Sequence, residues 1–148
     1  MQALVFELAD GRYAVSLAAV DEIVRAVAVV PLPGAPALVE GIVDVHGEVA
    51  AVIDLRRAFD LPARPPLALD HFVVVRTPAR LLVLRVDRVT GVTAVDPPDR
   101  VPAAVATASL EGSVRLADGL VLVHDVDRLV SSVEGATLDA LLRNRKSE

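Results

Sequence analysis

Short runs of apolar and β-branched residues recur along the chain, and turn-forming residues separate them. Each run spans about five to seven residues, which is the length of a strand rather than of a helix. Gly or Pro lies in the segments 9–12, 46–48, 77–80 and 117–120, where we expect hairpins. The pattern predicts an all-β protein with strands at ALVFEL, RYAVS, AVAVV, GIVDV, EVAAVI, HFVVVR, RLLVLRV, GVTAV and LVLVHDV.

Helical patterns are brief. Asp54 and Asp125 each precede a short helical pattern and have side chains suited to accept its first N–H groups. The segment 137–145, TLDALLRNR, has the pattern of a terminal amphipathic helix, and the Pro-rich segments 61–69 and 96–109 are typical of connectors. One further helix is predicted from four apolar residues that share a face at helical spacing: Leu17, Val20, Ile23 and Val24.

The chain contains an internal repeat. The segment 40–59 aligns without a gap on 111–130, at an offset of 71, and six of the twenty positions are identical. The segments upstream, YAVSLAAVDEIV and LLVLRVDRVTGV, match in apolar pattern at an offset of 69. Units of this size bury little core alone. We therefore expect two similar β units with a shared apolar interface and a groove along their seam.

Composition excludes several classes of function. The 148 residues suit one domain, and the absence of Cys excludes thiolate catalysis and Cys-ligated zinc. The net charge is −5 and the basic residues are scattered, so we expect no nucleic-acid partner. No apolar run approaches the roughly 20 residues that span a bilayer, and the N-terminus lacks a signal-peptide pattern. We expect a cytoplasmic protein without direct membrane insertion.

Four stretches in order cover the chain from about residue 4 to 130: VFELADGRYAVSLAAVDEIV, PLPGAPALVEGIVDVHGEVAAVIDLRRAF, VDRVTGV and LEGSVRLADGLVLVHDVDRLV. Together they resemble the CheW-like adaptor family of bacterial chemosensory signalling. The resemblance implies an all-β fold of two five-stranded SH3-like β barrels that share a core, with short helices and a C-terminal helix. It also implies a single domain over 1–148, made of two intertwined barrel subdomains.

The resemblance further implies a non-enzymatic adaptor without a cofactor. Its partners would be the regulatory domain of a CheA-type histidine kinase and the cytoplasmic tip of a methyl-accepting chemoreceptor. The protein would then be recruited to chemoreceptor arrays. The residues implied on the kinase side are Gly41, Asp44, His46 and Gly47. Those implied for the receptor groove are Val20, Glu22, Ile23, Val86 and Asp87.

The sequence departs from the family pattern at the turn Asp44-Val45-His46-Gly47, where the family usually reads Asn-Leu-Arg-Gly. His46 stands where an Arg typically pairs with the acid of the preceding segment, here Glu22. Ala51 and Val83 also replace a usual Pro and Gly. Three interpretations of His46 remain open: a turn residue, the partner of Glu22, or a catalytic or metal-binding group.

Each of the other candidate functional residues also has a purely structural explanation. Asp54 and Asp125 could form an acid/base pair, but helix N-caps explain both more simply. The three His residues lie far apart and lack the short spacings of zinc sites, so we expect no metal. Repeated Gly in a strand marks a bulge or a close backbone approach. The apolar groove candidates, together with Leu17, could be core residues.

Two other functions remain open for the protein. One is a paralogue that keeps one interface for assembly or localisation, and the other is a small-ligand-binding β-barrel or enzyme.

Overall fold

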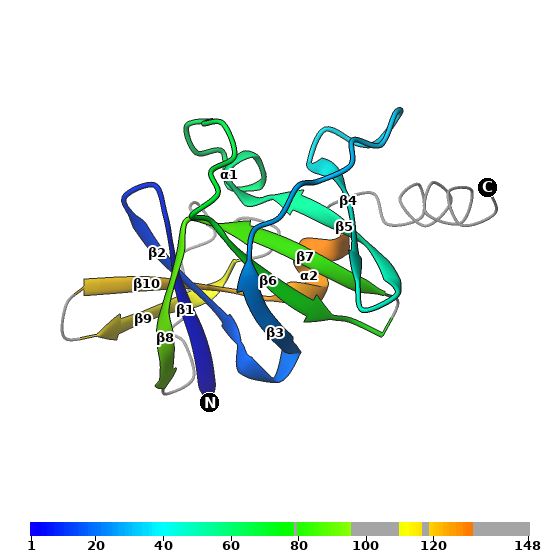
Figure 1. Ribbon diagram of the computed structural model, residues 1–148. Coiled ribbons are helices and arrows are strands. Elements are labelled where there is room, and N and C mark those ends of the chain that lie inside the picture. Colours follow the sequence, from blue (N-terminus) through cyan, green and yellow to red (C-terminus); the bar gives the residue numbers. More distant parts are fainter. Residues whose placement is uncertain (79, 96–109, 117–118, 132–148) are drawn as a thin grey trace.

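The computed structural model describes residues 1–78, 80–95, 110–116 and 119–131. Within these residues the chain is almost entirely β, with three short helical segments (Figure 1). The strands are β1 (Gln2–Leu8), β2 (Gly11–Ser16), β3 (Val20–Arg25), β4 (Val39–Val45), β5 (Glu48–Asp54), β6 (His71–Arg76), β7 (Leu81–Val86), β8 (Arg88–Ala94), β9 (Leu110–Leu116) and β10 (Gly119–His124). The helices are the 3-10 turn η1 (Leu17–Ala19), α1 (Leu55–Ala58) and α2 (Val126–Ser131).

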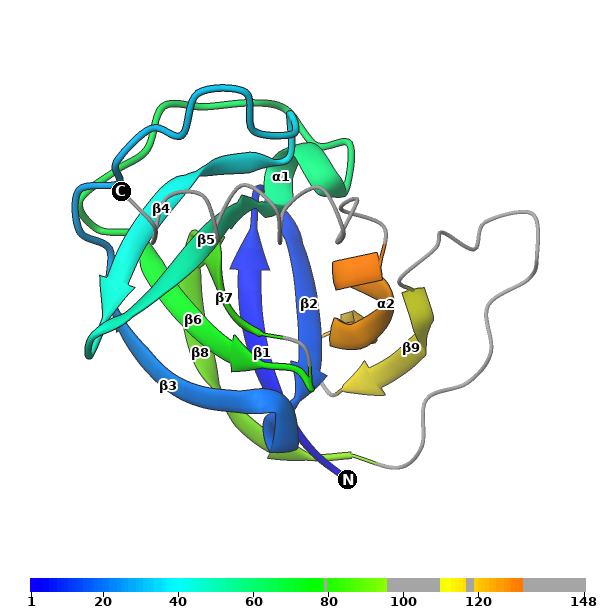
Figure 2. The same ribbon diagram turned by 90° about the vertical axis from the view of Figure 1, so that its right-hand side faces the viewer.

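The described strands form two five-stranded sheets. The first sheet has the order β8-β1-β2-β10-β9, and the second has the order β3-β6-β7-β5-β4. Each begins from one hairpin, but the strand after that hairpin crosses to the other sheet: β3 pairs with β6, and β8 pairs with β1. Figure 2 shows β3 beside β6 rather than beside β2, which precedes it in the chain. Each sheet is therefore built from both halves of the sequence.

Strand registers confirm the internal repeat. In the β4–β5 hairpin Gly41 lies opposite Val52, and in the β9–β10 hairpin Gly112 lies opposite Val123, which reproduces the offset of 71. Both ladders also shift register at the residue before the glycine. This shift is a β-bulge, in which one extra residue on a strand lies unpaired. The repeat is thus structural down to the position of an irregularity.

The second offset relates the two leading hairpins. Val5 pairs with Ala14 in β1–β2, and Val74 pairs with Val83 in β6–β7. Val74 follows Val5 by 69 positions, and Val83 follows Ala14 by the same number. The crossing strands obey the same offset, because Glu22 of β3 lies opposite Val74. Its counterpart on β8 is Gly91, which lies opposite Val5. The two halves therefore have equivalent topology.

Both predicted N-caps are present. The Asp54 Oδ1 accepts a hydrogen bond from the Arg57 N at 3.2 Å, at the start of α1. The Asp125 Oδ1 accepts from the Arg128 N at 3.0 Å, at the start of α2. Each carboxylate satisfies an N–H that the first helical turn leaves without an intrahelical partner. The N-cap interpretation of the two aspartates is confirmed.

Two local predictions were wrong. The apolar pattern from Leu17 to Val24 forms a 3-10 turn and then strand β3, not a helix. A bulge between Val20 and Glu22 interrupts strict alternation, so the apolar positions acquire a spacing that resembles a helix. The run at 26–30 is not a strand, and only Val30 makes a bridge, with Ile42. The predicted C-terminal helix and the 96–109 connector lie outside the described residues.

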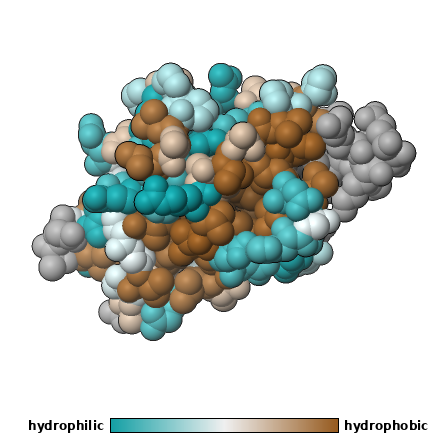
Figure 3. Space-filling model, viewed as in Figure 1, coloured by the Kyte–Doolittle hydropathy of each residue, from teal (hydrophilic) through white to brown (hydrophobic). Residues whose placement is uncertain are grey.

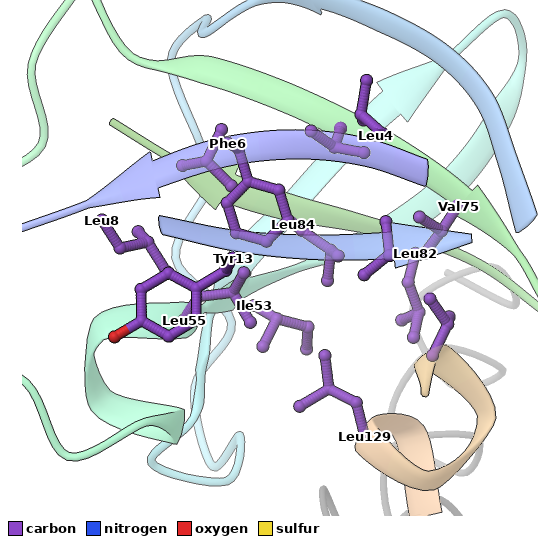
Figure 4. Packing of buried hydrophobic residues seen from close by; sticks show 14 of the residues in the cluster. Leu4, Phe6, Leu8, Tyr13, Ile53, Leu55, Val75, Leu82, Leu84 and Leu129 are labelled. Atoms are coloured by element: carbon purple, nitrogen blue, oxygen red, sulfur yellow. The ribbon is translucent and has the colours of Figure 1, made fainter. Parts of the chain in front are cut away.

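The main core lies between the two sheets and draws on both. Ten of its residues are labelled in Figure 4, from β1, β2, β5, β6, β7 and the two α-helices: Leu4, Phe6, Leu8, Tyr13, Ile53, Leu55, Val75, Leu82, Leu84 and Leu129. Each fully buried Leu or Val contributes about 1.5–3 kcal/mol relative to an exposed one. A smaller apolar cluster lies within each sheet. The fold is two five-stranded SH3-like barrels that share a core, as the resemblance to the CheW-like family implies.

Candidate protein-interaction site

The β4–β5 hairpin turns at His46 and Gly47. Both have a positive φ, 51° at His46 and 89° at Gly47, which is what a two-residue type I′ turn requires. The Asp44 Oδ1 accepts a hydrogen bond from the Gly47 N at 2.8 Å. This Asx bond fixes the turn. The interpretation of His46 as a turn residue is confirmed for its backbone.

The His46 side chain reaches from the turn to strand β3. Its Nε2 lies 2.8 Å from the Glu22 Oε1. The His46 side chain is 79% exposed and that of Glu22 is 34% exposed, so solvent screens the pair. We call this contact the Glu22–His46 clasp. It confirms that the two side chains face each other, and it is compatible with the turn role because one concerns the side chain and the other the backbone.

A second polar link lies beside the clasp. The Arg76 Nε, at the end of β6, donates to the Asp21 Oδ2 at 3.1 Å, and its Nη2 lies 3.5 Å from the Glu48 Oε1. Arg76 thus joins β3 to the first residue of β5. A shallow depression of about 250 Å³ lies between this link and the clasp. The edge of the second sheet therefore carries a rim of charged residues around the hairpin.

An apolar seam lies between β3 and β4, which are at opposite ends of the second sheet and do not pair with each other. A depression of about 220 Å³ follows it. Val24 and Val43 line its sides, and the buried Phe72, Val74 and Val83 form its floor. Figure 3 shows a broad apolar area across the face on which β3 and β6 lie in Figure 1. We call this depression the β3–β4 seam.

Apolar residues of β3 and of the segment after it are exposed. Ile23 is 40% exposed, Val24 38% and Val27 60%. Single exposed apolar residues are ordinary on a protein surface, but several that adjoin one depression are typical of an interaction site. Of the residues predicted for the receptor groove, Glu22 lines this depression, together with Val24 and Val27. Ile23 is exposed on the opposite face of β3, because side chains alternate along a strand and Ile23 lies opposite Val73 of the main core. Val20 is half-buried and packs against the main core.

Gly41 lies at the far end of β4 from the hairpin. A Cβ at this position would collide with the Val30 carbonyl oxygen, and it would lie 2.5 Å from the Val29 Cγ1. Val30 and Ile42 exchange two backbone hydrogen bonds there, at 2.9 and 2.8 Å. The 26–30 segment therefore crosses β4 closely enough to require glycine. The structure explains Gly41 by this close approach and not by exposure to a partner.

Two groove candidates lie elsewhere. Val86 is fully buried in the main core, so its side chain has no access to a partner. Asp87 lies at the crossover from β7 to β8, in an ion-pair network. Its Oδ2 accepts from Arg56 Nη2 at 2.6 Å, its Oδ1 accepts from Arg64 Nη2 at 2.7 Å, and the Ala9 N donates to its Oδ2 at 2.8 Å. The resemblance implied that Val86 and Asp87 share the receptor groove with Glu22. In the structure both lie away from the Glu22 side chain, Val86 in the core and Asp87 in the ion-pair network.

The network continues to a buried carboxylate, Asp70, whose side chain is 1% exposed. Arg64 Nη2 donates to it at 2.6 Å, Arg85 Nη1 at 3.1 Å and the Leu67 N at 3.0 Å. Burial alone would raise the pKa of Asp70, but these three donors lower it below its ordinary value. Arg85 also makes a bidentate pair with Glu40. The network fastens the 61–70 connector to the barrel.

A third depression, of about 320 Å³, lies between η1, the β6–β7 turn and the start of α2. His124 lies at its edge and is 4% exposed. Its ring stacks on Phe59, with 4.1 Å between centroids, and lies 5.9 Å from that of Tyr13. Burial lowers the pKa of His124 to about 4. Residues of both sheets line this depression, and the groove predicted along their interface stays a prediction.

Sequence reasoning missed the arginines that organise these surfaces. Arg76 links two strands of the rim, and Arg64 joins Asp70 to Asp87. Each partner lies at least six positions away in the sequence, and some lie more than twenty away. No local spacing rule predicts such contacts. The sole signal was that the Pro-rich connector contains one Arg within an otherwise apolar stretch.

Within the described ranges, no group of three or more His, Asp or Glu side chains is placed to hold a metal ion. In that same part of the chain, no helix is long and apolar enough to cross a membrane.

Fold and surface together define a double-barrel protein with a candidate interaction surface on its second sheet. Comparison of the sequence with protein families and with known proteins agrees with this fold. The model of the CheW-like domain matches residues 2–134. The chemotaxis protein CheW of Treponema pallidum (strain Nichols) is 30% identical over 142 residues, which cover 90% of this chain and 84% of that protein. The chemotaxis protein CheW of Rhizobium meliloti (strain 1021) is 26% identical, with coverage of 98% and 89%.

A solved structure is similar as well. The scaffolding protein TtCheW from Thermoanaerobacter tengcongensis superposes with a TM-score of 0.73 at 27% identity, over 83% of this chain and 87% of that one. The chain belongs to the CheW-like domain family.

Proposed function

We propose that this protein is a non-enzymatic adaptor in a chemosensory system, which couples chemoreceptor tips to a CheA-type histidine kinase. Family membership supports this role, because two relatives are named chemotaxis proteins and one is named a scaffolding protein. The observation that carries it is the docking surface of the second sheet. Charged residues surround exposed apolar side chains there, which is the anatomy of a protein interface.

The kinase side of this surface is proposed to be the hairpin turn, with Asp44, His46 and Gly47, while Gly41 supports it through the crossing of the 26–30 segment. The receptor side is proposed to include Ile23 and Glu22, with Val20 at the edge of the core. Val86 and Asp87 would act indirectly, by supporting the barrel. The chain would act as one domain of two intertwined barrels, in the cytoplasm at chemoreceptor arrays.

Separate binding measurements with the two partners test the proposal. The kinase regulatory domain and a soluble receptor-tip fragment from the same organism are titrated into the full chain. We expect both to bind, with Ile23→Asp weakening receptor binding at least about tenfold because it places a charge in an apolar contact. Val92→Asp is the matched control, since Val92 is 50% exposed on β8 of the other sheet.

Ile23→Asp must keep the wild-type melting temperature for its effect to count as a surface effect. Binding of neither partner by the folded wild-type chain would contradict the proposal. Binding of one partner alone would contradict the coupling role and leave an assembly or localisation factor.

A further inference from the structure

The Glu22–His46 clasp closes one end of the β3–β4 seam. At the other end, the backbone of Val30 bonds to that of Ile42. Between these two points β3 and β4 are not paired with each other. The clasp therefore fixes the distance between β3, which carries Ile23, and the hairpin, which carries Asp44 and Gly47.

Two links of different chemistry hold this end of the seam. Arg76 joins Asp21 to Glu48 and, as a guanidinium, keeps its charge at every physiological pH. The His46 ring carries a charge only when it is protonated. A charge-assisted hydrogen bond is roughly twice as strong as a neutral one. The first link is permanent, whereas the strength of the second depends on pH.

Charged residues from the neighbouring strands line the same two depressions as His46. Asp21 and Glu22 come from β3, Asp44 and Glu48 flank the ring on its own hairpin, Arg76 comes from β6, and Arg25 lies at the end of β3. Carboxylates thus outnumber guanidinium groups around the ring.

The other sheet shows that the clasp is not a requirement of the fold. The position equivalent to Glu22 in the first sheet is Gly91, which has no side chain and lies opposite Val5 as Glu22 lies opposite Val74. The same barrel topology is therefore built without an acid at this position. A feature that one barrel has and its structural duplicate lacks calls for a reason outside the fold.

We propose that the Glu22–His46 clasp makes docking on the second sheet dependent on pH: the protonated His46 ring reinforces the Arg76 link and holds β3 and the hairpin in the docking arrangement, and the neutral ring holds them more weakly. This inference rests on the proposed function, since it concerns regulation of the same surface. A surface held in its bound shape before contact loses less conformational entropy on binding, so affinity is higher when the clasp is charged.

The test compares affinity for the kinase regulatory domain at pH 6 and pH 8 in wild type and His46→Arg, at constant ionic strength. The ratio of the two affinities at each pH cancels titration of the partner's own groups. We expect the wild type to equal His46→Arg at pH 6 and to bind roughly two- to fivefold more weakly at pH 8, the range of an exposed ion pair. His46→Gln should be weak at both pH values. An unchanged ratio of wild type to His46→Arg would overturn the proposal.

Two controls separate this proposal from the proposed function. His71→Gln removes another imidazole of the same sheet and should leave the pH dependence of binding unaltered. A double-mutant cycle of Glu22→Gln and His46→Gln, followed by thermal melting of the free chain, should show coupling at pH 6 that fades at pH 8. If no variant binds either partner, the proposed function fails. The cycle then decides the clasp: coupling that is equal at both pH values overturns it, and coupling confined to pH 6 supports it.

Discussion

The guanidinium of Arg56 donates to the carboxylate of Asp87, with 2.6 Å between Nη2 and Oδ2. Arg56 belongs to helix α1 of the first half of the chain, and Asp87 lies where the second half crosses from one sheet to the other. The Asp87 carboxylate also accepts from Ala9, in the β1–β2 turn of the first sheet. One side chain thus ties together a helix, a crossover and a turn that are far apart in the sequence.

Removing this carboxylate should destabilise the fold. Asp87→Ala leaves Arg56 and Arg64 facing each other without Asp87 between them, and their side chains are 15% and 23% exposed. We expect a loss of about 2–4 kcal/mol in the free energy of unfolding, because breaking a largely buried pair leaves uncompensated charge. Urea denaturation measures it. Arg88→Ala is the control: it breaks the exposed Arg88–Glu7 pair and should cost about 0–1 kcal/mol.

His124 should make stability depend on pH. Its folded pKa of about 4 lies below the ordinary value of 6.5, so the unfolded chain takes up the proton first as pH falls. Stability is therefore lost progressively from about pH 6.5 down to pH 4, by about 3 kcal/mol in total. Urea denaturation at a series of pH values measures this loss.

The variant His124→Leu isolates that contribution, because Leu does not titrate and the equivalent position in the first half holds Ile53. We expect its stability to fall less steeply than that of the wild type over the same pH interval. Parallel curves for the two proteins would show that His124 titrates normally in the folded state.

Substitutions in the core should lower stability, whereas substitutions on the proposed docking surface should lower binding. Leu84 is 1% exposed in the main core, and Leu84→Ala should cost about 2–5 kcal/mol, the range for truncating a buried Leu. Leu17 is half-buried against that core, so Leu17→Ala should lower the melting temperature by less. Ile23→Ala should change stability by no more than about 0.5 kcal/mol and should weaken receptor binding. Loss of stability in Ile23→Ala without loss of binding would assign Ile23 to the core.

A methyl group at position 41 should open the second sheet. Gly41→Ala would push its Cβ into the backbone of the crossing segment at Val30, and overpacking of this kind costs about 1–3 kcal/mol. Faster hydrogen exchange at the Ile42 amide, which donates to Val30, should accompany the loss. Gly34→Ala serves for comparison, because its φ is 78° but its Cβ would meet open space. Gly41 does not share the positive φ of Gly34, so unchanged stability and unchanged exchange in Gly41→Ala would mean that the crossing segment accommodates the methyl group.

Sequence patterns predicted the features that local chemistry controls. The hairpin turn at His46 and Gly47 follows from residues that tolerate positive φ, and the caps at Asp54 and Asp125 follow from a carboxylate one residue before a helix. The duplication was visible because equivalent strands must keep their apolar positions to bury the same face. Each of these features depends on neighbours within a few positions along the chain.

The misassigned segments show where local patterns fail. Strand β3 resembled a helix because a bulge shifts its apolar positions, and a bulge is defined by the partner strand β6. The 26–30 run is apolar and β-branched, yet no strand lies beside most of it. Strand formation requires a partner for the backbone, and the sequence of a segment does not specify whether one is available.

By itself the sequence determined the all-β class, the repeat, the turns and caps, and through resemblance the contact between Glu22 and His46. The tertiary structure alone decided that Val86 is buried, that Asp87 serves an ion-pair network, and that each half sends a strand into the other's sheet. The physical reason is the range of the interactions. Turns, caps and alternation are fixed by neighbours in the chain, whereas burial and ion pairing depend on which distant segments the crossing strands bring together.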